Sequence, residues 1–145
     1  MAISVKKIAL WRGKFENRPG TLARVLEPAA ASRTDLQVVM GYREPGDTEG
    51  AVIEVYPVAG AKMRGALKSA GVQPSSIPSL LVSGDNRPGL GHAMARGLAD
   101  AGIDIAFIVA QTVGRKFSAV FGFATEDDAT RAVGLLKKAA TAKKR

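Results

Sequence analysis

The chain has no cysteine and only one histidine, His92, among its 145 residues. Disulfides, thiolate zinc sites and a cysteine nucleophile are therefore excluded, and a single histidine cannot build a multi-histidine metal centre. Apolar runs are also short, and the longest, around residues 103–110, cannot span a bilayer. The N-terminal stretch lacks the apolar segment of a signal peptide. We expect a cytoplasmic protein with no membrane segment, no metal and no cofactor.

Catalytic signatures are missing as well. The sequence contains no Gly-x-Ser-x-Gly, no phosphate loop with its lysine, no dinucleotide-binding fingerprint and no paired carboxylates in apolar surroundings. No residue is a candidate for catalysis, and we predict that the protein is not an enzyme.

Positive charge is in excess, with a formal net charge of +8. Five of these charges lie near the C-terminus, at Lys137, Lys138, Lys143, Lys144 and Arg145. A solvated basic tail therefore explains most of the excess, and nucleic-acid binding is an alternative rather than the main expectation. The proportions of hydrophobic residues (46%) and charged residues (23%) are typical of a globular protein with a core.

One pentapeptide occurs twice. Glu16-Asn17-Arg18-Pro19-Gly20 and Asp85-Asn86-Arg87-Pro88-Gly89 lie 69 positions apart and share four of five residues. The same offset aligns, without a gap, Val25 with Met94, Ala30 with Ala99, Asp35 with Asp104 and Leu36 with Ile105. A register held over so long a stretch indicates an internal duplication.

Each copy predicts the same order of elements. A short β-branched and apolar stretch before each pentapeptide, at residues 5–11 and 79–83, predicts a strand. After each Pro-Gly, apolar residues recur every three or four positions and predict a helix, which Pro28 should kink or shorten in the first copy. Paired strands and a second helix follow, at 36–42, 51–58 and 61–70 in the first copy and at 103–113, 117–124 and 126–140 in the second.

The two copies end differently. Residues 71–78 have room only for a short fourth strand, and the polar residues after 140 supply none to the second copy. We therefore predict one domain at 1–77, a second at 78–140 and a basic tail at 141–145. The second domain should have an unpaired sheet edge that favours a partner.

The repeated pentapeptide has a structural and a functional interpretation. Structurally, proline presets φ, glycine permits a tight turn and the polar residues begin a helix. Functionally, a helix start exposes unpaired N–H groups at the positive end of the helix dipole, which suits a carboxylate. The two interpretations are compatible.

Together, the acid-Asn-Arg-Pro-Gly loop, the amphipathic helix and Gly102-Ile103-Asp104-Ile105 resemble the ACT family. The resemblance covers nearly the whole chain, twice, and is closest to small stand-alone proteins with two ACT modules. It implies an α+β fold of two tandem ferredoxin-like βαββαβ modules, which form one continuous antiparallel sheet with helices on one face. Ser32-Arg33-Thr34 and Pro28 depart from the pattern in the first copy.

The resemblance also implies a regulatory function, because ACT modules bind amino-acid effectors between modules beside the first strand-to-helix loop. Carried over to this chain, the ligand-binding positions are Asn17, Gly20, Thr21 and Leu22, and Asn86, Gly89, Leu90 and Gly91. We expect an amino-acid sensor that forms a homodimer and regulates a separate enzyme. A branched-chain or aromatic ligand is favoured, since no charged residue is an obvious side-chain partner in both loops, and the second copy is the better binding candidate.

Several residues and two other functions stay open. His92 either reaches a ligand or lies on the helix surface, and Trp11 and Tyr42 either line a site or pack in a core. Phe117, Phe121 and Phe123 alternate along one strand, as in an RNA-binding sheet, but the match to that motif is poor, and core or interface packing explains them well enough. Nucleic-acid binding through the sheet and basic tail, or a structural oligomerisation module, are the alternatives.

Overall fold

The computed structural model describes residues 3–43, 46 and 49–141. It divides the chain into two compact units, one of them Ala9–Ser76 and the other Met1–Ile8 together with Ile77–Arg145. The boundary predicted from the sequence assigned residues 1–8 to the first domain, whereas the structure assigns them to the second unit. Lys143, Lys144 and Arg145 of the predicted tail lie outside the described residues.

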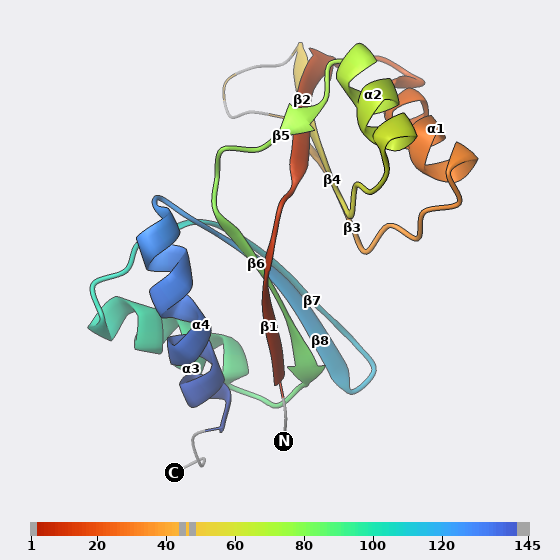
Figure 1. The fold of residues 1–145 in the computed structure, drawn as a ribbon. Coiled ribbons are helices and arrows are strands. Elements are labelled where there is room, and N and C mark those ends of the chain that lie inside the picture. Colours follow the sequence, from red (N-terminus) through yellow and green to blue (C-terminus); the bar gives the residue numbers. More distant parts are fainter. Residues whose placement is uncertain (1–2, 44–45, 47–48, 142–145) are drawn as a thin grey trace. The chain divides into compact units, whose positions relative to one another are not determined.

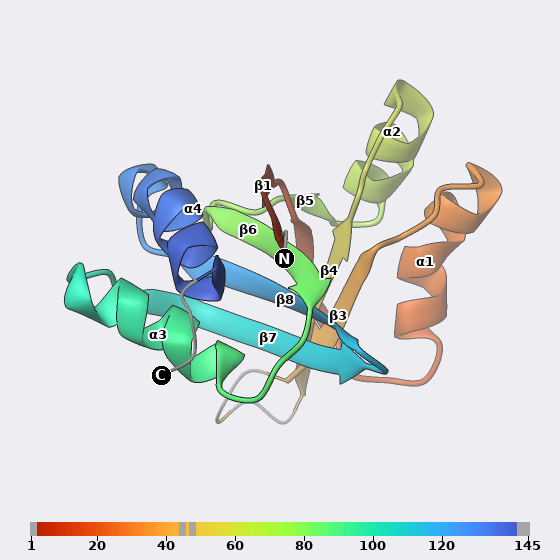
Figure 2. The same ribbon diagram turned by 90° about the horizontal axis from the view of Figure 1, so that it is seen from below.

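The first unit has the βαββαβ order. Its elements are β2 (Trp11–Glu16), α1 (Thr21–Ala31), β3 (Val38–Tyr42), β4 (Gly50–Tyr56), α2 (Ala61–Ser69) and β5 (Gln73–Pro74). The strands pair antiparallel in the order β3-β4-β2-β5, and both helices lie on one face of this sheet (Figure 2). Apolar side chains from sheet and helices form the core: Trp11, Val25, Ala29, Ile53, Val55, Met63, Leu67 and Val72.

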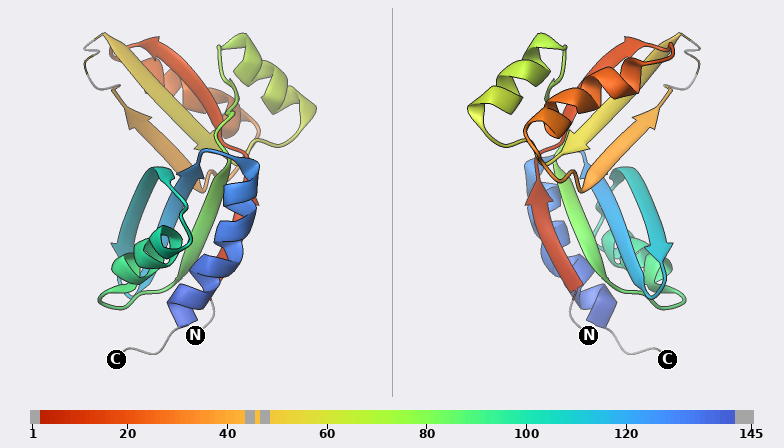
Figure 3. Two further views of the ribbon diagram at one scale, coloured as in Figure 1. Left: turned by 90° about the vertical axis from the view of Figure 1, so that its left-hand side faces the viewer. Right: turned by 90° about the vertical axis from the view of Figure 1, so that its right-hand side faces the viewer.

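The second unit repeats this plan with a strand taken from the N-terminus. Its later elements are β6 (Ser79–Asp85), α3 (Leu90–Asp100), β7 (Ile105–Val113), β8 (Lys116–Phe123) and α4 (Glu126–Thr141). β1 (Ile3–Ile8) pairs antiparallel with β6, as Figure 1 and Figure 3 show, and the sheet order is β1-β6-β8-β7. β1 therefore fills, beside β6, the place that β5 fills beside β2 in the first unit.

This borrowed strand explains two corrections to the sequence prediction. The apolar stretch 5–11 is not one strand, because β1 ends at Ile8 and β2 begins at Trp11 in the other unit. The strands of the described residues also pair as two four-stranded sheets rather than as one continuous sheet. The edge of β6 that a continuous sheet would need is already paired with β1.

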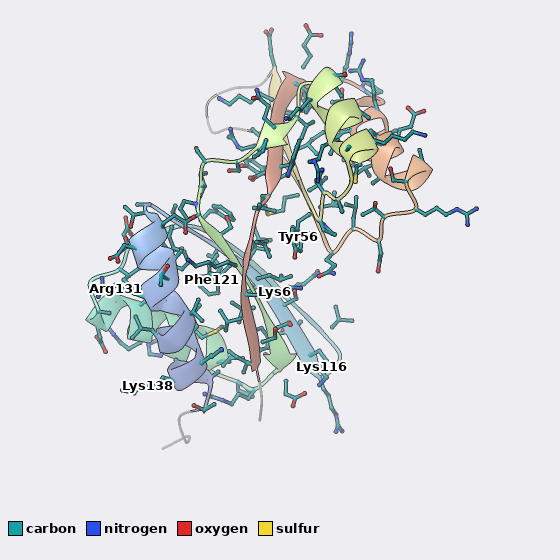
Figure 4. All side chains as sticks on the ribbon, in the orientation of Figure 1. Lys6, Tyr56, Lys116, Phe121, Arg131 and Lys138 are labelled. Carbon is teal, nitrogen blue, oxygen red and sulfur yellow. The ribbon has the colours of Figure 1, made fainter. Side chains whose placement is uncertain are left out.

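The alternating phenylalanines of β8 belong to the core of the second unit. Phe117, Phe121 and Phe123 are buried, with Phe121 and Phe123 each only 1% exposed. Figure 4 shows the Phe121 side chain within the unit rather than on an outer surface. Because bases stack on exposed aromatic rings, this strand does not present the platform of an RNA-binding sheet.

The helices follow the signals in the sequence with one difference. α4 begins with three acidic residues, and the Thr125 hydroxyl accepts the Asp128 N–H at 3.1 Å, which stabilises its first turn. α1 contains Pro28 but continues past it to Ala31. None of the described helices combines the length and apolarity needed to cross a bilayer.

Candidate functional site

The two repeated loops have the same backbone geometry. The Asn17 N–H donates to the Glu49 carbonyl at 2.6 Å, and the Asn86 N–H donates to the Arg115 carbonyl at 2.8 Å. Gly20 and Gly89 both have a left-handed conformation, with φ of 91° and 84°. Glycine is favoured at both positions because a side chain would strain this backbone. The duplication therefore preserves the conformation of the loop as well as its sequence.

Both loops lead into a helix start that no side chain caps. In the second unit, the Leu90 and Ala93 N–H groups donate to the carbonyls of Arg87 and Gly89. The N–H groups of Gly91 and His92 have no such acceptor among the described residues. Neither α1 nor α3 has an acidic residue in its first turn. Free donors at the positive end of a helix dipole form a suitable site for a carboxylate.

A groove of about 280 Å³ lies beside the loop of the second unit, and we call it the second groove. The loop, α3, β7 and β8 line it with Asn86, Leu90, Gly91, Met94, Ile108, Ala110, Gln111, Thr112, Phe117 and Ala119. None of these side chains is charged. Three of the four predicted residues line the groove, and the fourth, Gly89, adjoins it as the residue before α3.

The first unit has the corresponding groove, with a volume of about 320 Å³, which we call the first groove. Its lining residues are Asn17, Arg18, Thr21, Leu22, Gly41, Tyr42, Arg43, Ala51, Val52 and Ile53. Six of these positions match lining positions of the second groove at the offset of the repeat: 17, 21, 22, 41, 42 and 43. Gly20 again adjoins the groove without lining it. Two independent copies therefore have a groove at the same place.

In the first groove, the side chain of Asn17 already accepts hydrogen bonds from another residue of the groove. The Arg43 guanidinium donates from Nη2 at 2.6 Å and from Nε at 2.8 Å to the side-chain oxygen of Asn17. This amide orientation is assigned because the opposite one would set N–H groups against N–H groups. By contrast, the Asn86 side chain has no hydrogen bond to the described residues. The Asn86 amide of the second groove is therefore free to bind a ligand, whereas the Asn17 amide of the first groove is already hydrogen-bonded.

Tyr42 forms one wall of the first groove and contacts a buried carboxylate. Its hydroxyl donates to Glu54 Oε2 at 2.9 Å, and Glu54 is 1% exposed. Burial raises the pKa of the Tyr42 hydroxyl, and the hydrogen bond to Glu54 raises it further, while Arg12 acts in the opposite direction. Trp11, the other aromatic residue considered for the site, packs instead in the core of the first unit.

Other candidates lie outside the grooves. His92 is exposed on α3 and lines neither groove. No group of three or more His, Asp or Glu side chains within the described ranges could hold a metal ion. The residues that sequence reasoning missed lie on the edge strand β7 or just after the edge strand β3, above all Ile108, Thr112 and Arg43. Strand alternation could have identified the two residues of β7, because Ile108, Ala110 and Thr112 share one face of it.

Comparison by sequence identifies no relative. No protein-family model matches the chain, and no curated protein matches it.

Comparison by structure identifies similar folds over nearly the whole chain. Protein BT0572 from Bacteroides thetaiotaomicron superposes with a TM-score of 0.73 at 16% identity, over 95% of this chain and 99% of that one. The ligand-free regulatory subunit of aspartate kinase from Thermus thermophilus gives 0.65 at 15% identity, over 96% and 97%. The allosteric aspartate kinase of Clostridium acetobutylicum gives 0.57 at 14% identity, over 97% of this chain and 35% of the enzyme. The tandem ACT-like, ferredoxin-like fold predicted from the sequence is confirmed.

Proposed function

We propose that this protein is a regulatory amino-acid sensor without catalytic activity of its own. The observation that carries the proposal is the pair of equivalent grooves, each beside a glycine-turned and uncapped helix start. Similarity in fold to a regulatory subunit of aspartate kinase supports a regulatory role. We keep the cytoplasmic location and the absence of a cofactor as predictions.

In the second groove, the N–H groups of Gly91 and His92 would hold the α-carboxylate of the ligand. The free side chain of Asn86 would bind its ammonium or carboxylate group. Met94, Ile108 and Phe117 provide apolar surface for the ligand side chain. Because no charged residue lines this groove, it favours a neutral branched-chain or aromatic amino acid.

The partner that converts binding into a signal is a second copy of the chain. β7 is an edge strand without a charged residue, and its Ile108, Val109 and Val113 are 50%, 51% and 72% exposed. Pairing of this edge with a second copy would bury these side chains and cover the groove that β7 borders. A ligand bound there would favour the paired arrangement, and a separate enzyme would respond to it.

The test is a thermal-shift screen of the whole protein against the twenty free amino acids at millimolar concentration. Binding to the native state raises the free energy of unfolding by mass action, by about 2.7 kcal/mol at a ligand concentration of a hundred times Kd, and the melting temperature rises with it. We expect a selective rise with one apolar amino acid or a few. A uniform absence of shifts would overturn the proposal and leave the structural or nucleic-acid alternative.

Two substitutions at Gly91 locate the site. Gly91 has open space around it, so a large side chain is compatible with the fold there. Leu22 stands at the equivalent position and leaves the first groove open, so a larger residue is needed, and Gly91→Trp blocks the second groove. Gly91→Ala is the matched control, because both residues favour a helix more than glycine does. We expect Gly91→Trp to abolish the shift and Gly91→Ala to retain it. Equal shifts in both variants would place the ligand elsewhere.

A further inference from the structure

The two grooves differ in charge at one edge. Arg43 and Arg18 line the first groove, whereas Thr112 stands at the position equivalent to Arg43 in the second, and no charged side chain lines that groove. We propose that the first groove binds an amino acid with an acidic side chain, so that one chain senses two chemical classes of ligand. This inference rests on the proposed function.

Arg43 keeps its charge available. Its partner in the first groove is the neutral oxygen of Asn17, so this hydrogen bond leaves the positive charge of Arg43 uncompensated. A guanidinium has five N–H donors, of which Nε and one on Nη2 are used here. The remaining donors match the two oxygens of a carboxylate, and such charge-assisted bonds are stronger than a bond to an amide.

Arg18 supplies a second positive charge to the first groove. Its guanidinium lies 3.5 Å from Glu16, and the two side chains are 60% and 80% exposed. Exposed pairs of this kind contribute little and exchange readily. Glu16 and Glu54 do not line the groove. Two guanidinium groups and the start of α1 therefore surround a space that no carboxylate of the described residues lines.

The hydrogen bond to Asn17 also explains selectivity. A ligand ammonium can reach the Asn17 oxygen only after Arg43 moves away. A neutral amino acid gives the displaced guanidinium no new partner, whereas an acidic side chain offers a carboxylate in exchange. The first groove therefore discriminates against neutral ligands, because they would leave a charged donor without its acceptor.

Calorimetric titration of the Gly91→Trp protein isolates the first groove, since the second is blocked. We expect glutamate or aspartate to bind at least tenfold more tightly than glutamine or asparagine, and more weakly as salt is raised. Arg43→Gln should lower the affinity for the acidic ligand about 10- to 100-fold, the range of a charge-assisted hydrogen bond. Arg64→Gln, which removes the same charge from the exposed surface of α2, is the matched control and should bind as its parent.

A gain of function completes the experiment. In the otherwise unaltered protein, Thr112→Arg transfers the guanidinium to the second groove and should raise the number of acidic ligands bound per chain from one to two. Three results would each overturn the inference. The first is an unchanged number of acidic ligands bound by Thr112→Arg, and the second is equal affinity of the first groove for the acidic amino acid and its amide. The third is an Arg43→Gln protein that binds the acidic ligand as tightly as Arg64→Gln does. If apolar amino acids still bind the second groove in that case, the proposed function stands; if no amino acid binds either groove, both fail.

Discussion

Arg33 and Gly102 occupy the same position in the two units, and both have a positive φ, of 54° and 73°. Each lies just beyond the end of the first helix of its unit. The next residue in each case bonds back to the helix, with Thr34 N–H donating to Ala29 at 2.9 Å and Ile103 N–H to Leu98 at 3.0 Å. The helix ending is therefore shared, but only the second unit has the glycine that favours it.

Arg33→Gly should stabilise the first unit. Relief of left-handed strain, about 1–2 kcal/mol, exceeds the added entropy of the unfolded chain, and we expect a net gain of about 0.5–1 kcal/mol. Urea unfolding monitored by Trp11 fluorescence measures the gain in stability. The reciprocal change, Gly102→Ala, should destabilise the second unit. Loss of stability on Arg33→Gly would contradict the strain argument.

Gly122→Ala should destabilise the second unit. Gly122 pairs with Phe107 across β7 and β8, and a Cβ at this glycine would overlap the Phe107 ring. Overpacking of this kind costs about 1–3 kcal/mol. In a Phe107→Ala background the same change should cost far less, so a double-mutant cycle from denaturant unfolding gives the coupling directly. If the effects of Gly122→Ala and Phe107→Ala on stability were additive, the Phe107 ring would not depend on the lack of a side chain at Gly122.

Removal of residues 1–8 should weaken the second unit selectively. Ile3 and Val5 pack against its core, and their loss with the strand pairing should cost about 2–4 kcal/mol. Hydrogen exchange should accelerate in β6 and remain slow in β4. Lys7→Ala, which removes only exposed contacts with Glu126 and Thr130, is the control and should cost less than about 1 kcal/mol. Equal acceleration in both sheets would contradict the assignment of β1 to the second unit.

Tyr42→Phe should make the free energy of unfolding depend less on pH in the alkaline range. The pKa of this hydroxyl is raised above 10.0 in the folded chain, so the folded state keeps a proton that the unfolded state loses. Its contribution is intact below that pH and is lost as pH rises through the folded pKa. Since the side chain is 43% exposed, the effect is modest. Urea midpoints over about pH 9–11 should fall more steeply in the wild type than in Tyr42→Phe, and parallel curves would contradict the shift.

The duplicated pentapeptide made much of the fold predictable. Its constant offset carries loop, helix and hairpin together, because all depend on local patterns that the two copies share. The strand at residues 1–8 could not be assigned this way. Ile3–Ile8 and Trp11–Glu16 differ in no local property that selects a sheet, and their partners, β6 and β4, lie far along the chain.

The sites were predictable only in outline. Asn17, Thr21, Leu22, Asn86, Leu90 and Gly91 line the grooves as expected from their position beside the loops. Arg43 was not foreseen, since it acts across the groove from Asn17 and lies at the start of a loop with no counterpart in the second copy. Which side chains face each other across a groove depends on strand register, which local sequence does not specify.

The borrowed strand also sets an order for synthesis on the ribosome. β1 is translated before β6, its only partner strand in the described chain, and the whole segment Ala9–Ser76 lies between them. That segment can complete its own sheet while β1 is still unpaired, because domains fold as units when they emerge from the ribosome. The residues of β1 then stay unpaired until β6 has been made, and the second unit completes its sheet only with this strand.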